Sequence, residues 1–260
     1  MKDNLKISLV QFNISERKKE NFVRLEKLFS QIICTDIILL PEMFNTSFLP
    51  NQTDLAEPMN GDTIAWMKKI AKKYNCSVVG TLMIAQNEKL YNRLVWIKKN
   101  LEILTYDKKH LFSIAKEDKY LNKGDRKIIV EQDGWKICPL ICYDLRFPVF
   151  IRNIENYDVL IFLANWPEKR IDSWCTLLKA RAIENQCISV GVNRIGKDCN
   201  NISYNGSSKV IDVFGKEIDS CEKDKEDIVT VTLNKHKYKR QKNKFNFLND
   251  LDKELSLIHI

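Results

Sequence analysis

The chain has 260 residues, of which 44% are hydrophobic and 29% are charged, the balance of an ordinary soluble globular protein. It has no apolar run of the roughly 18 residues that a membrane span needs and no signal-peptide core at its start, so we expect a cytoplasmic protein with no membrane partner. The net charge of +8 comes largely from the basic segment 235–244, which favours a solvated tail over a nucleic-acid surface.

Strand-like and helix-like patterns alternate along most of the sequence. In chain order they predict a strand over 5–12, a helix over 16–33, a fully buried strand over 37–40, a helix over 63–74 capped by Asp62, two paired strands over 76–85 and 90–97, and a strand over 101–105. After an irregular polar stretch come strands over 135–141 and 159–164, a helix over 173–186, and strands over 188–192, 207–213 and 227–233.

No internal repeat or linker divides the chain. We therefore expect one α/β domain over residues 1–234, followed by a C-terminal arm over 235–260. The absence of a GxGxxG or GxxxxGK[ST] motif argues against a dinucleotide-binding or P-loop enzyme. The eight cysteines lack the short spacings of zinc sites, so we expect reduced thiols and no metal.

Three segments place reactive side chains where a strand ends. Glu42 follows the buried strand 37–40, and Cys142 follows the strand 135–141, where a nucleophile is exposed yet fixed in position. The charged segment 106–112 lies between them in the sequence. Each has a simpler interpretation, as a surface glutamate, a buried thiol or an exposed turn, and Cys138 on the same strand is expected in the core.

Taken together and in order, these segments resemble the nitrilase superfamily of carbon–nitrogen hydrolases. They match its PE, K-x-H-L-F and C-Y-D-x-R-F-P signatures, and the similarity extends over residues 5–233 with further landmarks at 165–167 and 179–186. The resemblance is closest to the ω-amidase branch, and the arm is similar to the closing segment of that branch. Asn246 stands there in place of the usual proline.

The resemblance implies a single-domain, four-layer αββα sandwich, a homodimer, and no metal or organic cofactor. It also implies hydrolysis of the terminal amide of 2-oxoglutaramate and related ω-amides. We assign the Glu-Lys-Cys triad to Glu42 as proton acceptor, Lys109 as ammonium and Cys142 as nucleophile. The backbone N–H of Tyr143 is a candidate second oxyanion donor. Glu117 is a candidate for positioning Lys109 or the substrate amide, with a solvated charge as the alternative.

Substrate recognition is argued from position alone. A dicarboxylate mono-amide carries a carboxylate that a basic group should bind, and Arg146 lies near Cys142 in sequence. It could equally hold the turn through Asp144. Phe44 and Trp166 follow strand ends and could line a small pocket, or belong to the core. We interpret His110 as a residue that holds its loop by hydrogen bonding.

Other functions remain open from the sequence. An N-carbamoyl hydrolase or a nitrilase would use the same triad, so the triad identifies the type of bond better than the substrate. A non-catalytic scaffold that binds another protein, or a nucleic-acid-binding role for the basic arm, would come from different functional classes.

Overall fold

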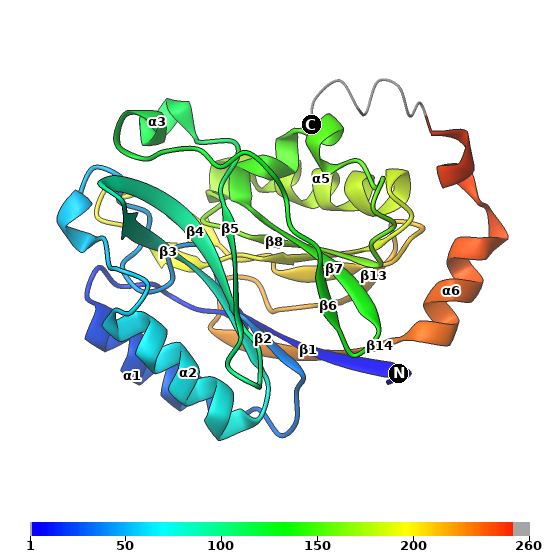
Figure 1. The fold of residues 1–260 in the computed structure, drawn as a ribbon, viewed down its shortest axis with the longest axis horizontal. Coiled ribbons are helices and arrows are strands. Elements are labelled where there is room, and N and C mark those ends of the chain that lie inside the picture. Colours follow the sequence, from blue (N-terminus) through cyan, green and yellow to red (C-terminus); the bar gives the residue numbers. More distant parts are fainter. Residues whose placement is uncertain (1, 252–260) are drawn as a thin grey trace.

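Two six-stranded sheets pack face to face in the computed structural model, which describes residues 2–251 (Figure 1). The first sheet has the strand order β14-β1-β2-β3-β4-β5 and the second β13-β12-β9-β8-β7-β6. Parallel pairs β1–β2–β3 and β7–β8–β9 form the centre of each sheet, and antiparallel strands complete both edges. Helices cover the outer faces. The predicted αββα sandwich is confirmed.

The strands of the first sheet come from the N-terminal half of the chain and from its end. They are β1 (Asn4–Gln11), β2 (Ile37–Leu39), β3 (Ser77–Gln86), β4 (Lys89–Ile97), β5 (Ile103–Asp107) and β14 (Asp227–Asn234). The long pairs β1–β14 and β3–β4 correspond to the predicted strands over 5–12, 227–233, 76–85 and 90–97.

The strands of the second sheet come from the C-terminal half. They are β6 (Val130–Gln132), β7 (Trp135–Ile141), β8 (Val159–Leu163), β9 (Ile188–Val192), β12 (Lys209–Ile211) and β13 (Glu217–Ser220). A separate two-stranded hairpin, β10 (Ile195–Lys197) and β11 (Ser203–Asn205), follows β9 directly. The sequence patterns missed β6, β10, β11 and β13, because each is only three or four residues long.

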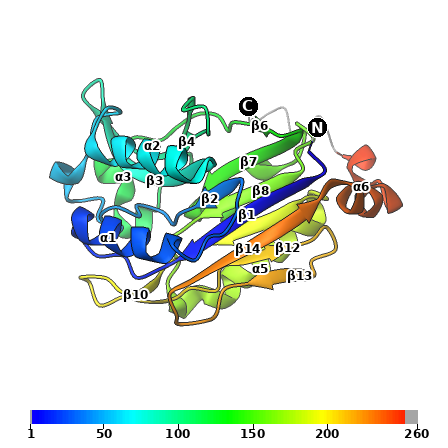
Figure 2. The same cartoon turned by 90° about the horizontal axis from the view of Figure 1, so that it is seen from below.

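Helices α1 (Lys18–Phe29) and α2 (Asp62–Tyr74) lie on the outer face of the first sheet, and α5 (Ile171–Glu184) lies on that of the second (Figure 2). Both N-terminal helices bury one stripe of apolar side chains against the sheet and expose a lysine-rich face. Helix α2 begins at Asp62 after Gly61, with no side-chain cap, so the predicted capping by Asp62 is wrong.

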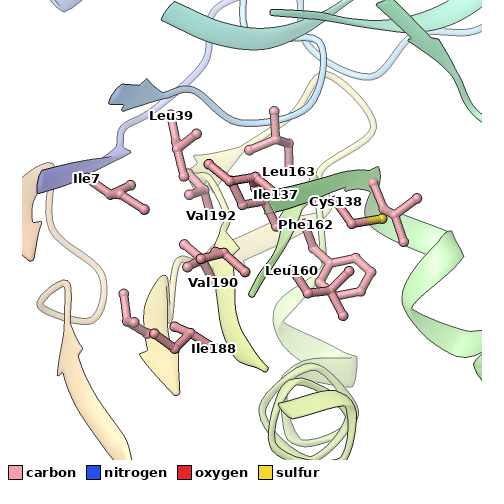
Figure 3. Close-up of a cluster of buried hydrophobic side chains, with 14 of the residues drawn as sticks. Ile7, Leu39, Ile137, Cys138, Leu160, Phe162, Leu163, Ile188, Val190 and Val192 are labelled. Carbon is pink, nitrogen blue, oxygen red and sulfur yellow. The ribbon is translucent and has the colours of Figure 1, made fainter. Parts of the chain in front are cut away.

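The core between the sheets is entirely apolar at its centre. Ile7 and Leu39 of the first sheet point toward Val190 and Val192 of the second (Figure 3). All five residues of β8 are buried, as expected for a strand at the centre of the second sheet, between β7 and β9. The wholly apolar runs in the sequence therefore mark the central strands.

The basic segment 235–244 forms a helix, α6 (Lys235–Lys244), rather than an extended tail. Most of its cations are exposed, but Tyr238 is buried against Trp135 at 5.8 Å between ring centroids. Lys235 pairs with Asp158. The arm thus packs on the domain through one side of its helix. The rest of the expected arm, residues 252–260, lies outside the described residues.

Two short helices complete the described fold: α3 (Glu117–Tyr120) and α4 (Pro148–Ile151). A 3-10 turn over Cys142–Arg146 follows β7 without a break.

No helix within residues 2–251 is long and apolar enough to cross a membrane.

Candidate active site

Three strand ends meet at one pocket. Glu42 lies three residues beyond β2, Lys108 directly follows β5, and Cys142 directly follows β7. All three side chains line the same cavity. Glu42 and Lys108 are each about 1% exposed, whereas Cys142 is partly exposed. The opposed sheets therefore bring together residues that lie 34 to 100 positions apart in the sequence.

The lysine at this site is Lys108, and the sequence-based assignment of Lys109 is corrected. The Lys108 ammonium lies 2.8 Å from Glu42 Oε1 and 2.9 Å from Glu117 Oε2. The Lys109 ammonium donates instead to the backbone carbonyl of Asp125 at 3.1 Å, away from the pocket. Side chains alternate along an extended chain, so Lys108 shares the inward face of buried Tyr106 and Lys109 faces the other way.

Two carboxylates share the Lys108 ammonium. The Asn92 amide completes their network by donating to Glu42 Oε1 at 2.8 Å and to Glu117 Oε1 at 2.9 Å. Burial would lower the pKa of Lys108, but the carboxylates of Glu117 and Glu42 outweigh burial and hold that pKa above its usual value. The two carboxylates therefore favour the ammonium form of Lys108.

Glu117 is fully buried, so its interpretation as a solvated charge is wrong. Besides Lys108 and Asn92, it accepts a hydrogen bond from the backbone N–H of Phe112 at 2.6 Å. Burial raises its pKa, the Lys108 ammonium opposes that effect, and the nearby Glu42 carboxylate adds to it. The structure places Glu117 where it orients Lys108.

Cys142 occupies a strained turn at the end of β7. Its φ of +39° is unusual for a residue with a side chain, and such strain concentrates at sites where the surrounding structure fixes the backbone. Burial and the Glu42 carboxylate raise the pKa of the Cys142 thiol well above its ordinary value, whereas Lys108 lowers it. These effects together favour the protonated thiol of Cys142, which lies beside Glu42.

Asn165 fixes the position of Glu42. Its backbone N–H donates to Glu42 Oε2 at 3.0 Å, and its side-chain amide donates to the Glu42 carbonyl at 2.6 Å. Both contacts span 123 positions of sequence. The sequence named Asn165 as a landmark but gave no signal for this role, and Asn92 was missed altogether.

Asp144 joins the nucleophile turn to the loop that carries Lys108. One of its oxygens accepts from the Tyr106 hydroxyl at 2.8 Å and from the Ile141 N–H at 3.0 Å. The other accepts from the His110 N–H at 3.0 Å and lies 2.8 Å from His110 Nδ1. His110 therefore holds its loop by hydrogen bonding, as the sequence indicated, and Asp144 is not the partner of Arg146.

The cavity has a volume of about 150 Å³, which suits a small substrate. Arg146, Trp166 and Tyr143 line it, and the Arg146 guanidinium lies 5.0 Å from the centre of the Trp166 ring. Phe44 does not line the cavity. It is buried between the first sheet and α2, 5.9 Å from the ring of Trp66, so its assignment to the substrate pocket is wrong.

Further side chains around the cavity were not singled out from the sequence. They include Phe48, Pro50, Asn51, Phe112, Arg170, Asp198, Asn200, Ile202 and Tyr204. They come from loops and from the β10–β11 hairpin, whose placement depends on the folded chain rather than on local patterns.

Comparison with known proteins agrees with this geometry. The family model described as carbon–nitrogen hydrolase matches residues 6–243. The chain belongs to the carbon–nitrogen hydrolase family. It is therefore a hydrolase that acts on carbon–nitrogen bonds.

Named relatives of this hydrolase cover most of its length. The omega-amidase YafV of Yersinia enterocolitica is 39% identical over 75% of this chain and 76% of its own. The 2-oxoglutaramate amidase of Bacillus subtilis strain 168 is 36% identical over 81% of this chain and 83% of its own. Among solved structures, the CN-hydrolase superfamily protein XC1258 of Xanthomonas campestris, which has an arsenic adduct in its active site, is 36% identical. It covers 96% of this chain and 97% of its own with a TM-score of 0.93.

Proposed function

We propose that this hydrolase is an ω-amidase, which converts ω-amidodicarboxylates such as 2-oxoglutaramate and succinamate to the dicarboxylate and ammonia. Hydrolysis of the carbon–nitrogen bond is argued from the arrangement of Cys142, Glu42 and Lys108 in one small cavity. The choice of an anionic amide is argued from Arg146 and Arg170, which line the same cavity. The names of the relatives, an omega-amidase and a 2-oxoglutaramate amidase, support this substrate class.

The first half-reaction transfers the acyl group to Cys142. Glu42 accepts the thiol proton as the sulfur bonds to the amide carbonyl carbon, and the carbonyl electron pair moves onto oxygen. The Lys108 ammonium and the backbone N–H of Tyr143 stabilise this oxyanion. Glu42 then returns the proton to the nitrogen, the carbon–nitrogen bond breaks, and ammonia departs. The acyl group remains bound to Cys142 as a thioester.

The second half-reaction restores the enzyme. Glu42 takes a proton from water as the water oxygen attacks the thioester carbon, and the same two donors stabilise the second oxyanion. The carbon–sulfur bond breaks to release the dicarboxylate, and Glu42 returns the proton to the sulfur. Lys108 remains protonated throughout, because two carboxylates hold its charge.

Arg146 is the proposed partner of the distal carboxylate. Its guanidinium lies at the cavity wall against Trp166, so its planar face is supported while its N–H groups remain available. Arg170 lines the same cavity, with its guanidinium 5.4 Å from the centre of the Phe112 ring. Two guanidinium groups at one cavity favour an anionic amide over a neutral amide or nitrile.

The test is ammonia release from 2-oxoglutaramate and succinamate by wild type and Cys142→Ala, with a simple nitrile and an N-carbamoyl amino acid alongside. We expect turnover of both ω-amides, abolished by the substitution. Turnover of the nitrile or the carbamoyl compound alone would replace the ω-amidase proposal with another activity of the family. No turnover of any substrate by folded protein would favour a binding scaffold.

The same proposal includes a cytoplasmic homodimer. A cytoplasmic location suits an enzyme whose nucleophile must remain a reduced thiol. Three apolar side chains expose much of their surface: Ile183 of α5 (48%), Phe214 in the turn before β13 (46%) and Ile218 of β13 (41%). They offer apolar area to a second copy. Light scattering should give twice the 30.5 kDa chain mass, and a mass equal to one chain would contradict the dimer.

A further inference from the structure

Arg194 is a fully buried arginine that lies between β9 and the β10–β11 hairpin. Its guanidinium donates to Ser47 Oγ at 2.6 Å, to the Ile14 carbonyl at 2.9 Å and to Asn13 Oδ1 at 3.2 Å. It also donates to the carbonyls of Ile195 and Lys197 within the hairpin, at 3.1 and 3.3 Å. One side chain therefore joins three loops.

The acceptors around this guanidinium are all neutral, and no ion pair among residues 2–251 includes Arg194. Burial lowers the pKa of Arg194 from its ordinary value, and the nearby Tyr204 and Asp198 oppose this effect only in part. A buried cation with no carboxylate partner is costly, so a site retains it only where its donors are needed. Here the donors go to the backbone and side chains of segments that approach the cavity.

Two of the joined segments form walls of the cavity. Ser47, itself held at a φ of +69°, is followed directly by the wall residues Phe48, Pro50 and Asn51. The hairpin contributes four more wall residues, which are Asp198, Asn200, Ile202 and Tyr204. Most of these wall residues lie in loops rather than in helices or strands, so side-chain contacts from neighbouring segments help to fix their positions.

Arg194 also contacts Tyr204, one of the wall residues of the hairpin. Its guanidinium lies 4.7 Å from the centre of the Tyr204 ring. The Tyr204 hydroxyl donates to Asp198 Oδ2 at 2.9 Å, and Asp198 Oδ1 accepts from the backbone N–H groups of Asn200 and Ile202. The hairpin is therefore one connected unit, and Arg194 attaches it to the segment after Glu42.

We propose that Arg194 is a positioning residue that joins the two loop walls of the cavity and thereby sets the affinity for substrate. It contacts neither Glu42, Lys108 nor Cys142 in any hydrogen bond of residues 2–251, so it acts on binding through the walls. The kinetic part of this inference rests on the proposed ω-amidase function.

Arginine suits this role because its planar group presents five donors in a fixed arrangement, whereas lysine offers three from one atom. Arg194→Lys keeps the charge but cannot reach all three loops. Ser47→Ala is a milder variant that removes one acceptor and leaves the arginine in place. Ser189→Ala is the matched control, since Ser189 is equally buried on β9 and its Oγ has no hydrogen-bond partner within the described residues.

The experiment measures kcat and KM for succinamate together with the rate at which iodoacetamide alkylates Cys142, followed by peptide mass. We expect Ser47→Ala to raise KM roughly threefold and Arg194→Lys about tenfold or more, because single hydrogen bonds contribute amounts of this order. The value of kcat should stay within about threefold, since the reacting groups are untouched. Cys142 alkylation should be faster in both variants and unchanged in Ser189→Ala.

Unchanged KM and alkylation rates in folded Arg194→Lys and Ser47→Ala would overturn the inference, even if both proteins melted at lower temperature. A purely stabilising role would give that result. If the wild type turned over no ω-amide, the proposed function would fail by itself. The alkylation rates would then still decide whether Arg194 holds the walls.

Discussion

Lys108 and Lys109 are adjacent lysines, of which the first is fully buried and the second is only partly buried. An isolated buried ammonium would be strongly unfavourable, and here two carboxylates within 3 Å compensate it. Lys109 needs no such partners because its side chain lies on the other face of the chain. Two adjacent lysines therefore have different physical roles.

Replacing each lysine by methionine tests this assignment directly. Lys108→Met should lower kcat for succinamate about 10²- to 10⁴-fold, because it removes an oxyanion donor from a buried site. Lys109→Met should leave kcat within about twofold, since the Lys109 ammonium donates to the Asp125 carbonyl outside the cavity. Steady-state rates of ammonia release measure both. Equal losses in the two variants, or a larger loss in Lys109→Met, would contradict the role given to Lys108.

At the residue scale, the sequence selected Glu42 and Cys142 because each follows an apolar strand in a recognisable signature, and both line the same cavity in the structure. It misplaced the lysine because the segment was interpreted as a loop. Alternation from Tyr106 would have selected Lys108, which is also the first letter of the K-x-H-L-F signature. Phe44 was assigned to the pocket because it follows the end of a strand. Its packing against Trp66, which the sequence does not show, places it in the core.

At the element scale, hydrogen bonds between side chains and distant loops hold the loops of the candidate active site. Asp144 ties the turn after β7 to the loop after β5 across 34 to 38 positions, and Asn165 ties the end of β8 to Glu42 across 123. Strand and helix patterns are local and carry no information about such pairs. The central strands and helices could therefore be predicted from the sequence. The hydrogen bonds that fix the positions of the loops at their ends could not.

Helix α6 gives a prediction at this scale. Tyr238 is 2% exposed and packs on Trp135, with its hydroxyl 3.3 Å from the Gln186 carbonyl. Tyr238→Ala should lower the free energy of unfolding by about 3–5 kcal/mol, the usual cost of removing a buried aromatic ring. Urea unfolding followed by circular dichroism measures this loss.

Tyr238→Phe is the matched control for that experiment. It keeps the ring and removes only the hydroxyl, so the loss should be about 0.5–1.5 kcal/mol. Lys239→Ala, on the exposed side of the same helix, should change the stability by less than about 0.5 kcal/mol. If Tyr238→Ala resembled Lys239→Ala, the arm would not be part of the cooperative fold.

At the scale of the whole molecule, the four layers explain why the candidate active site lies at the ends of strands from both sheets. β2 and β5 of the first sheet and β7 of the second deliver Glu42, Lys108 and Cys142 to one cavity only because the sheets stack face to face. The αββα arrangement came from a family resemblance. Alternating apolar runs alone would also fit a doubly wound fold with a single sheet.

The same layered core buries thiols, which makes stability depend on pH. Burial raises the pKa of Cys138 to about 12, while an unfolded chain has a cysteine pKa near 8.5. Below pH 8.5 the thiol is neutral in both states, and its contribution to stability is complete. As the pH rises further, the unfolded chain loses the proton first. Stability from this residue should therefore fall by about 1.4 kcal/mol per pH unit until about pH 12.

Urea unfolding of wild type and Cys138→Ala at pH 7.5 and pH 10, under reducing conditions, isolates this contribution. At pH 7.5 the variant should be less stable, because the missing sulfur leaves a small cavity on β7. From pH 7.5 to pH 10 the wild type should lose about 2 kcal/mol more than the variant, since alanine has no proton to lose. Parallel losses in the two proteins would mean that the Cys138 thiol ionises equally easily in the folded and unfolded chains.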